Sequence, residues 1–191
     1  MIRLPWLPLL ALVLLSHCGG GSSSASFNVD PDPAAVTVGD RLNLSAHPAA
    51  ELTGDVEWEL DDPYSGGLRN SQGNSTVYFA PEKAGTYHLT LRANGSDGRR
   101  MKETVVLQVL PVPSVDPAST AVAPGGGVDF SASMKGLARN TVKWSVDEPE
   151  GGMISETGHY QAPTRTGTYH VTATSTLDPT ASARATVVVG G

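Results

Sequence analysis

The fold is decided by two related stretches of sequence, Val56-Glu57-Trp58-Glu59-Leu60 and Val142-Lys143-Trp144-Ser145-Val146. In both stretches apolar residues alternate with charged or polar ones, which is typical of a β-strand with one buried face and one solvent face. Each tryptophan lies on the apolar face between two aliphatic residues. We therefore expect Trp58 and Trp144 to be core residues rather than exposed platforms for a carbohydrate.

The sequence around these stretches repeats as well. Val29-Asp30-Pro31 returns as Val115-Asp116-Pro117 after 86 residues, and Gly85-Thr86-Tyr87-His88 returns as Gly167-Thr168-Tyr169-His170 after 82 residues. The spacing shortens after Leu68, so one loop of the second copy is four residues shorter. Short alternating runs separated by Gly, Pro, Asn and Asp predict strands joined by turns, and we expect essentially no helix.

Both copies carry the marks of an immunoglobulin-like sandwich. A large tryptophan on the third strand is a hallmark of that fold, and Tyr87 and Tyr169 are placed to form its tyrosine corner. The positions that form the disulfide in antibody domains hold apolar pairs here, Leu44 with Leu89 and Phe130 with Val171. We therefore predict an all-β chain of two tandem immunoglobulin-like β-sandwiches, over residues 26–110 and 111–191.

Several short motifs of the second copy occur in register. They are Val115-Asp116-Pro117-Ala118, Ala123-Pro124-Gly125-Gly126, Val142-Lys143-Trp144-Ser145-Val146, Gly158-His159-Tyr160-Gln161-Ala162-Pro163 and Gly167-Thr168-Tyr169-His170-Val171. On these motifs, residues 112–189 resemble the bacterial Ig-like domain of the group 2 type. Residues 27–109 fit that family more loosely, so a PKD-like sandwich is an alternative for the first copy. The resemblance implies a spacer, stalk or adhesive module without shared catalytic residues.

The N-terminal residues resemble a bacterial lipoprotein signal. An apolar stretch from Leu4 to Leu15, too short to span a bilayer unaided, is followed by Ser16-His17-Cys18. The resemblance to a lipobox implies that residues 1–17 are a cleaved signal peptide and that Cys18, the only cysteine, is acylated with fatty acids such as palmitate. A small residue normally precedes the cysteine, so His17 departs from the pattern, and an ordinary secretory cut near Ser24 is the alternative.

Residues 18–25 would then be the lipidated cysteine and a flexible tether rich in Gly and Ser. By resemblance to the usual sorting rule, Gly19 after the cysteine favours the outer membrane. We expect the protein to be held in the cell envelope through Cys18, at the outer membrane or the cell surface.

The charge balance argues against a nucleic-acid partner. The chain has 13 Lys and Arg against 19 Asp and Glu, a net charge of −6, and no basic patch. Nucleic-acid binding depends on clustered cations. The expected partners are therefore the membrane, through the lipid, and another envelope or surface protein or a glycan.

An acidic run is the best candidate for an ionic site, and it consists of Glu57, Glu59, Asp61 and Asp62. Neighbouring carboxylates repel one another, and a cation would relieve that repulsion. Calcium usually needs about six or more converging oxygen atoms, and the sequence has no DxDxDG pattern. A solvated acidic face is the default interpretation, with calcium binding as the alternative.

The histidines do not predict a metal site. Alternation turns His88 and His170 toward solvent, and no second ligand stands at metal-binding spacing. We expect His47 and His159 to lie in loops. The sequence has no G-x-S-x-G elbow, and a small sandwich offers little concavity. We therefore predict no enzymatic activity, no cofactor and no metal.

The sequence thus favours a non-catalytic cell-envelope lipoprotein that displays two Ig-like domains as a spacer, adhesion or protein-docking module. Leu110-Pro111-Val112-Pro113 joins the two copies with almost no slack, which predicts an end-to-end rod. The alternative is a carbohydrate-binding or cell-wall-binding surface module, which exposed aromatic residues such as Tyr64 or Phe79 would serve.

Overall fold

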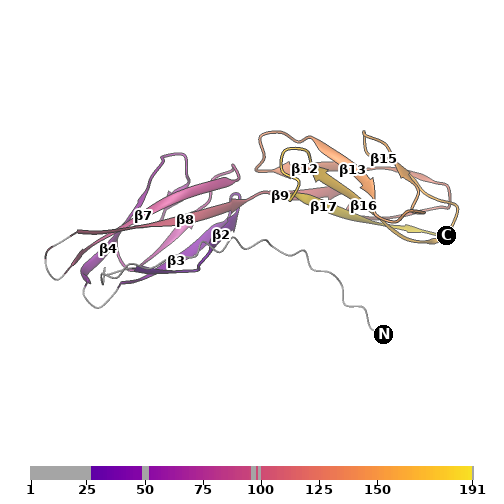
Figure 1. Cartoon of the computed structure of the whole chain (residues 1–191). Helices are drawn as coiled ribbons and strands as arrows, with labels where there is room; N and C mark the ends of the chain where they lie inside the picture. Colours follow the sequence, from indigo (N-terminus) through magenta and orange to yellow (C-terminus); the bar gives the residue numbers. More distant parts are fainter. Residues whose placement is uncertain (1–26, 49–51, 96–97, 99, 191) are drawn as a thin grey trace, which may run out of the picture.

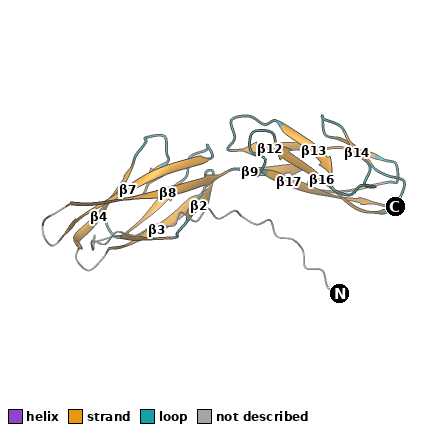
Figure 2. Ribbon diagram, in the orientation of Figure 1, coloured by secondary structure: helices purple, strands orange, loops and turns teal. Residues whose placement is uncertain are grey.

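The computed structural model describes residues 27–48, 52–95, 98 and 100–190, and every regular element in them is a β-strand (Figure 2). Two sandwiches lie end to end, and β8 (Arg100–Leu110) of the first leads into β9 (Val112–Asp116) of the second (Figure 1). The expected signal peptide, the tether, His17 and Cys18 lie outside the described residues. In the described part of the chain, no helix has the length and apolar character needed to cross a bilayer.

The first sandwich consists of two four-stranded sheets. One has the order β1-β3-β6-β5, with β1 at Phe27–Asp30, β3 at Arg41–Pro48, β6 at Ser75–Phe79 and β5 at Gly67–Leu68. The other has the order β2-β8-β7-β4, with β2 at Ala34–Thr37, β7 at Gly85–Gly95 and β4 at Leu52–Leu60.

The second sandwich follows a similar plan. One sheet has the order β10-β17-β16-β13, with β10 at Ser119–Val122, β17 at Ser182–Val189, β16 at Gly167–Ser175 and β13 at Val142–Val146. The other face is made of β9 paired with β12 (Ser131–Lys135), and of β11 (Gly127–Asp129), β15 (His159–Gln161) and β14 (Met153–Ile154) in the order β11-β15-β14.

The repeated Val-Asp-Pro motif marks the point where the first strand of each sandwich changes sheet. β1 pairs antiparallel with β3, and after Pro31 the chain crosses over so that β2 pairs parallel with β8. In the same way β9 pairs antiparallel with β12, and β10, which follows Pro117, pairs parallel with β17. Proline has no N–H to donate to a ladder, so it suits a break between two strands.

Each sandwich closes around its own hydrophobic core. In the first, Trp58 is 1% exposed and the pair Leu44 and Leu89 is fully buried. In the second, Phe130 and Val171 occupy the equivalent places and are also buried. The apolar pairs therefore stand where an antibody domain has its disulfide, as the sequence predicted.

The expectation for the second tryptophan needs a correction. Trp144 packs against the core of its sandwich, and its ring centroid lies 6.3 Å from that of Phe130, but the side chain is only partly buried. The segment that supplies the Gly73 carbonyl to the Trp58 indole is four residues shorter in the second copy, and there Gly158 lies close to the Trp144 ring.

The tyrosine corners are confirmed in both sandwiches. The Tyr87 hydroxyl donates to the Lys83 carbonyl at 2.8 Å, and the Tyr169 hydroxyl donates to the Arg165 carbonyl at 3.1 Å. Because each bond joins the start of a long strand to the loop before it, the corner fixes the path of the chain into β7 and β16.

A second pair of tyrosines is more deeply buried. Tyr78 and Tyr160 are both 0% exposed, and their hydroxyls donate to the carbonyls of Ser65 at 2.5 Å and Gly151 at 2.6 Å. Burial, with a smaller contribution from Tyr87, raises the pKa of Tyr78 to about 12. These phenols are therefore held neutral and tie the loops after β4 and β13 to the core.

Candidate functional site

The two sandwiches meet at a junction with its own contacts. The backbone N–H of Ala84, in the first sandwich, donates to the carbonyl of Gly136, in the second, at 2.9 Å. Beside this hydrogen bond, the Lys135 ammonium lies 3.2 Å from the Glu82 carboxylate. Two polar contacts therefore connect the last residue of β12 and the residue after it to the loop before β7.

Glycine is required at the centre of this junction. Gly136 has a φ of +97°, and a Cβ built on it would lie 2.7 Å from Cγ1 of Val38 and 3.3 Å from the Cβ of Ala84. Such a contact with Val38 is closer than two carbon atoms tolerate, and the positive φ disfavours other residues. The backbone of the second sandwich thus packs directly on apolar side chains of the first.

The connection between the sandwiches leaves little freedom. β8 ends at Leu110 and β9 begins at Val112, so Pro111 alone stands between the two strands. The Leu110 carbonyl accepts a hydrogen bond from the Val38 N–H at 3.0 Å, which holds the end of β8 to the first sandwich. The end-to-end arrangement in Figure 1 agrees with the rod predicted from this short linker.

The acidic run does not converge into a set of ligands. Glu59 forms an ion pair with Arg92, and Asp61 accepts a hydrogen bond from the Thr90 hydroxyl at 2.7 Å. The Asp62 carboxylate caps its own loop by accepting from the Tyr64 N–H at 2.8 Å. Glu57 is exposed on its strand. Among the described residues, no group of three or more His, Cys, Asp or Glu is placed to hold a metal ion.

His170 differs from the exposed residue that the sequence predicted. Its ring Nδ1 lies 2.6 Å from a carboxylate oxygen of Glu148, and its backbone N–H donates to the other oxygen at 2.8 Å. Burial alone would raise the pKa of Glu148, but the hydrogen bonds from His170 outweigh it and lower the pKa. Alternation does place His170 on the outer face, between the buried Tyr169 and Val171, but its exposure is lower than predicted because Glu148, after β13, contacts it, which sequence spacing does not reveal.

The same face of the second sandwich holds two further polar contacts. Arg184 on β17 places its Nε 2.8 Å from the Asp147 carboxylate, which also accepts from the Thr172 hydroxyl at 2.8 Å. The first sandwich repeats the second of these contacts as Thr90 to Asp61. The contact between Thr172 and Asp147 could have been found by comparing the two copies of the sequence. Its threonine and its aspartate both recur in the first copy, at the spacings of the repeat.

The other histidines are also placed by the structure. His88 is an exposed strand residue, as predicted. His47 and His159 lie in β3 and β15 rather than in loops, and they pair with Asp30 at 3.0 Å and Asp129 at 2.6 Å. Both pairs are exposed, so they contribute little to stability.

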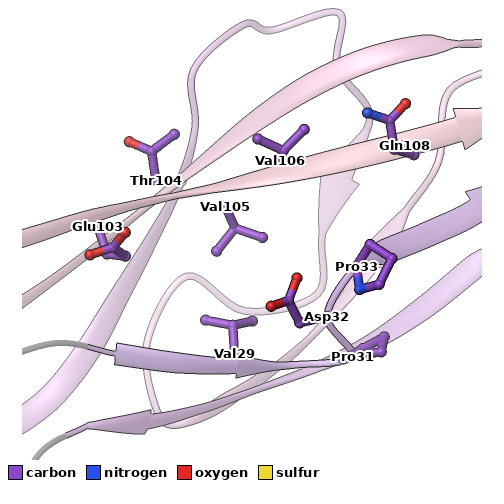
Figure 3. A pocket seen from close by; sticks show the side chains of 9 residues that line it. All are labelled: Val29, Pro31, Asp32, Pro33, Glu103, Thr104, Val105, Val106 and Gln108. Atoms are coloured by element: carbon purple, nitrogen blue, oxygen red, sulfur yellow. The ribbon is translucent and has the colours of Figure 1, made fainter. Parts of the chain in front are cut away.

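A hollow of about 310 Å³ opens where the first strand changes sheet (Figure 3). Its lining comes from the Val29–Pro33 segment and from β8, and Figure 3 shows Val29, Val105 and Asp32 grouped around it. β2 pairs with β8 only from Leu107 onward, so the earlier part of β8 lies beside the hollow. The hollow is thus a product of the strand switch, and its lining has no His, Cys or Lys.

The two aromatic residues considered for glycan binding have different surroundings. Tyr64 is 85% exposed in the loop after β4. Phe79 is partly buried, and the guanidinium carbon of Arg41 lies 5.5 Å from its ring centre. The face of Phe79 is therefore already occupied by a cation, whereas the Tyr64 ring is open to solvent.

No family model matches the chain, and no curated protein matches it. Among solved structures, a PKD domain determined in solution is 21% identical and covers 48% of this chain and 91% of its own, with a TM-score of 0.40.

Two solved structures with larger coverage of this chain are also similar. A C-terminal fragment of intimin, in complex with the intimin-binding domain of its receptor, is 15% identical, with 87% of this chain and 64% of that chain covered and a TM-score of 0.44. The insect immune protein hemolin is 15% identical, with 81% and 44% covered and a TM-score of 0.45. The immunoglobulin-like fold itself is established by the strand order, the strand switch and the tyrosine corners described above.

Proposed function

We propose that this chain is a non-catalytic cell-envelope lipoprotein that displays two immunoglobulin-like sandwiches as a spacer and a protein-docking module. The observation that carries the proposal is the junction. A spacer must hold its outer end at a set distance from its base, and this requires the domains to keep a fixed relative orientation.

Three features of the junction act together to fix that orientation. The single-residue connection restricts bending, because proline locks its own φ and restricts the residue before it. The hydrogen bond from Ala84 to Gly136 and the close packing at Gly136 define one docked arrangement. The ion pair between Glu82 and Lys135 adds a weak contact at the rim of the junction.

The base of the spacer would be the acylated Cys18. The sequence supports this part of the proposal through the apolar stretch from Leu4 to Leu15 and the single cysteine that follows it. Acyl chains on the cysteine would hold the protein at the membrane surface. The second sandwich would then be the outer domain, because it follows the first in the chain.

Fractionation of cells that produce the wild-type chain or Cys18→Ala tests the anchor. The wild type is expected in the membrane fraction, with label incorporated from radioactive palmitate. Cys18→Ala is expected in the soluble fraction without label, and Ser16→Ala serves as a control that retains the cysteine. Membrane retention of Cys18→Ala, or a wild type without label, would contradict the proposal.

A further inference from the structure

The two copies treat their central tryptophan differently. Trp58 is 1% exposed, and its indole N–H donates to the Gly73 carbonyl at 2.6 Å. Trp144 occupies the equivalent position and is only partly buried, and no acceptor for its indole N–H is found among the described residues. The two copies differ in the segment that runs from β5 to β6 of the first and from β14 to β15 of the second, where the second copy is four residues shorter.

In the first sandwich, this segment acts as a short additional strand. The Trp58 N–H donates to the Ser71 carbonyl at 2.8 Å, and the Gly73 N–H donates to the Val56 carbonyl at 2.9 Å. These two bonds form an antiparallel bridge between Glu57 and Gln72. Ser71–Gly73 therefore completes the outer edge of β4 and covers the indole at the same time.

In the second sandwich, the chain takes a shorter path. The Ser155 N–H donates to the His159 carbonyl at 2.9 Å, and the Gly158 N–H donates to the Ser155 carbonyl at 3.1 Å. This tight turn leads from β14 directly into β15, and its Gly158 lies against the indole, since a Cβ built on Gly158 would be 3.3 Å from Cε2 of Trp144. β13 is the last strand of its sheet, and in residues 100–190 no backbone group pairs with its outer edge as Ser71–Gly73 pairs with β4.

The register shows which backbone groups are left open. Trp144 faces Ala173 on β16 as Trp58 faces Leu91 on β7. In an antiparallel pair, alternate residues direct both backbone groups away from the neighbouring strand. The Trp144 N–H and the Val142 carbonyl consequently point outward from β13, and neither has a partner among the described residues.

The open edge and the open side of the indole lie in one hollow. Its volume is about 560 Å³, and it is lined by Val142, Lys143, Trp144, Ile154, Ser155, Glu156 and Thr176.

We propose that the outer edge of β13 is a docking edge for an extended segment of a partner protein, which adds a strand to the sheet and covers Trp144 as Ser71–Gly73 covers Trp58. This inference rests on the docking part of the proposed function.

The first sandwich also defines the chemistry of the segment that fits. Ser71–Gly73 is uncharged, and Gly73 has a φ of +100°, which favours glycine at that place. The hollow carries one cation, Lys143, and one anion, Glu156, so it does not select a strongly charged segment. The occupant is therefore a polar, uncharged strand with a glycine whose carbonyl accepts the indole N–H. Main-chain hydrogen bonds supply the affinity in this mode of recognition.

A peptide with the sequence of residues 70–75, which carries no charged residue and is blocked at both ends, tests the proposal in trans. It is added to the full chain labelled with ¹⁵N, and the amide and indole signals of Trp144 are followed. Both signals are expected to shift in a saturable manner, and hydrogen exchange of the Trp144 amide is expected to slow at least about tenfold. The Trp58 signals, whose groups are already covered, are expected to stay in place.

Two matched variants sharpen the test. A peptide carrying Gly73→Pro lacks the N–H that would reach the Val142 carbonyl, so it should bind about tenfold more weakly or not at all. In the protein, replacement of Ser155–Thr157 by residues 69–75 restores the four missing residues while keeping Gly158, and it should abolish binding by covering β13 from within the chain.

The proposal is overturned if the peptide leaves the Trp144 amide unchanged, or if the Gly73→Pro peptide binds equally well. It is also overturned if a chitooligosaccharide shifts the indole signal alone while the peptide has no effect, because that result would identify a glycan platform. Failure of this test leaves the anchor and the rigid junction intact, and both are measured separately.

Discussion

Glu82 of the first sandwich and Lys135 of the second meet across the junction, with a carboxylate oxygen 3.2 Å from the ammonium nitrogen. Both side chains are largely exposed, so the pair should contribute only about 0.2–1 kcal/mol. Glu82→Lys is expected to weaken the coupling of the two sandwiches, and the double variant Glu82→Lys with Lys135→Glu to restore it. Rotational correlation times from ¹⁵N relaxation, measured for each sandwich at low salt, check this. Equal values in all three proteins would show that the pair has no role.

The two tryptophans should differ in their contribution to stability. Trp58→Ala removes a fully buried ring and should cost about 3–5 kcal/mol of unfolding free energy. Trp144→Ala removes a ring that is only partly buried, so it should cost about half as much. Denaturant unfolding monitored by circular dichroism measures both values. A larger loss for Trp144→Ala than for Trp58→Ala would contradict the difference in cover described above.

The buried phenol of Tyr78 predicts a loss of stability in alkaline solution. Its pKa is raised from 10.0 to about 12 in the folded state, so the neutral form is favoured by folding. The stabilisation is complete below pH 10 and is lost as the pH rises toward 12, by about 2–3 kcal/mol. Tyr78→Phe should show a weaker pH dependence in that range, although it also loses the hydrogen bond to Ser65. Parallel pH profiles for the two proteins would be inconsistent with this account.

The lowered pKa of Glu148 predicts a loss of folding stability in acidic solution. Its pKa is lowered in the folded state from the ordinary value of 4.5, so the contribution to stability is present above that pH and is lost as the pH falls through the folded pKa. Glu148→Gln should lower stability at pH 7 by about 1 kcal/mol and reduce the pH dependence below 4.5. Glu156→Gln, at an exposed position, is the control. It should change neither the stability at pH 7 nor the dependence of stability on pH. Thermal unfolding at pH 3 and pH 7 compares the three proteins.

The sequence predicted those parts of the fold that depend on local patterns. The alternation around Trp58 and the repeated Gly-Thr-Tyr motif each lie within a few residues, so both the strands and the tyrosine corners could be found without a structure. The apolar pair Leu44 and Leu89 followed from the same pattern. The immunoglobulin-like fold defines which positions face each other on the two strands that correspond to β3 and β7.

The features that the sequence did not predict depend on contacts between distant segments. The exposure of Trp144 depends on how the segment between β14 and β15 lies against it, and the four-residue difference in length does not by itself specify that path. The contact between Glu148 and His170 depends on the direction of the chain after β13. The close packing at Gly136 involves Val38, which is almost a hundred residues away.

The most direct test of the central claim is the distance distribution between two spin labels, one on each sandwich. In a background where Cys18 is replaced by Ser, cysteines are introduced at Lys102 and Thr168, which are both exposed. The account predicts one narrow distribution in this protein and a broad one after Gly136→Val, while Gly67→Val, at a position with free space around it, should leave the distribution narrow. A broad distribution without any change at the junction would contradict the proposal that the chain is a rigid spacer.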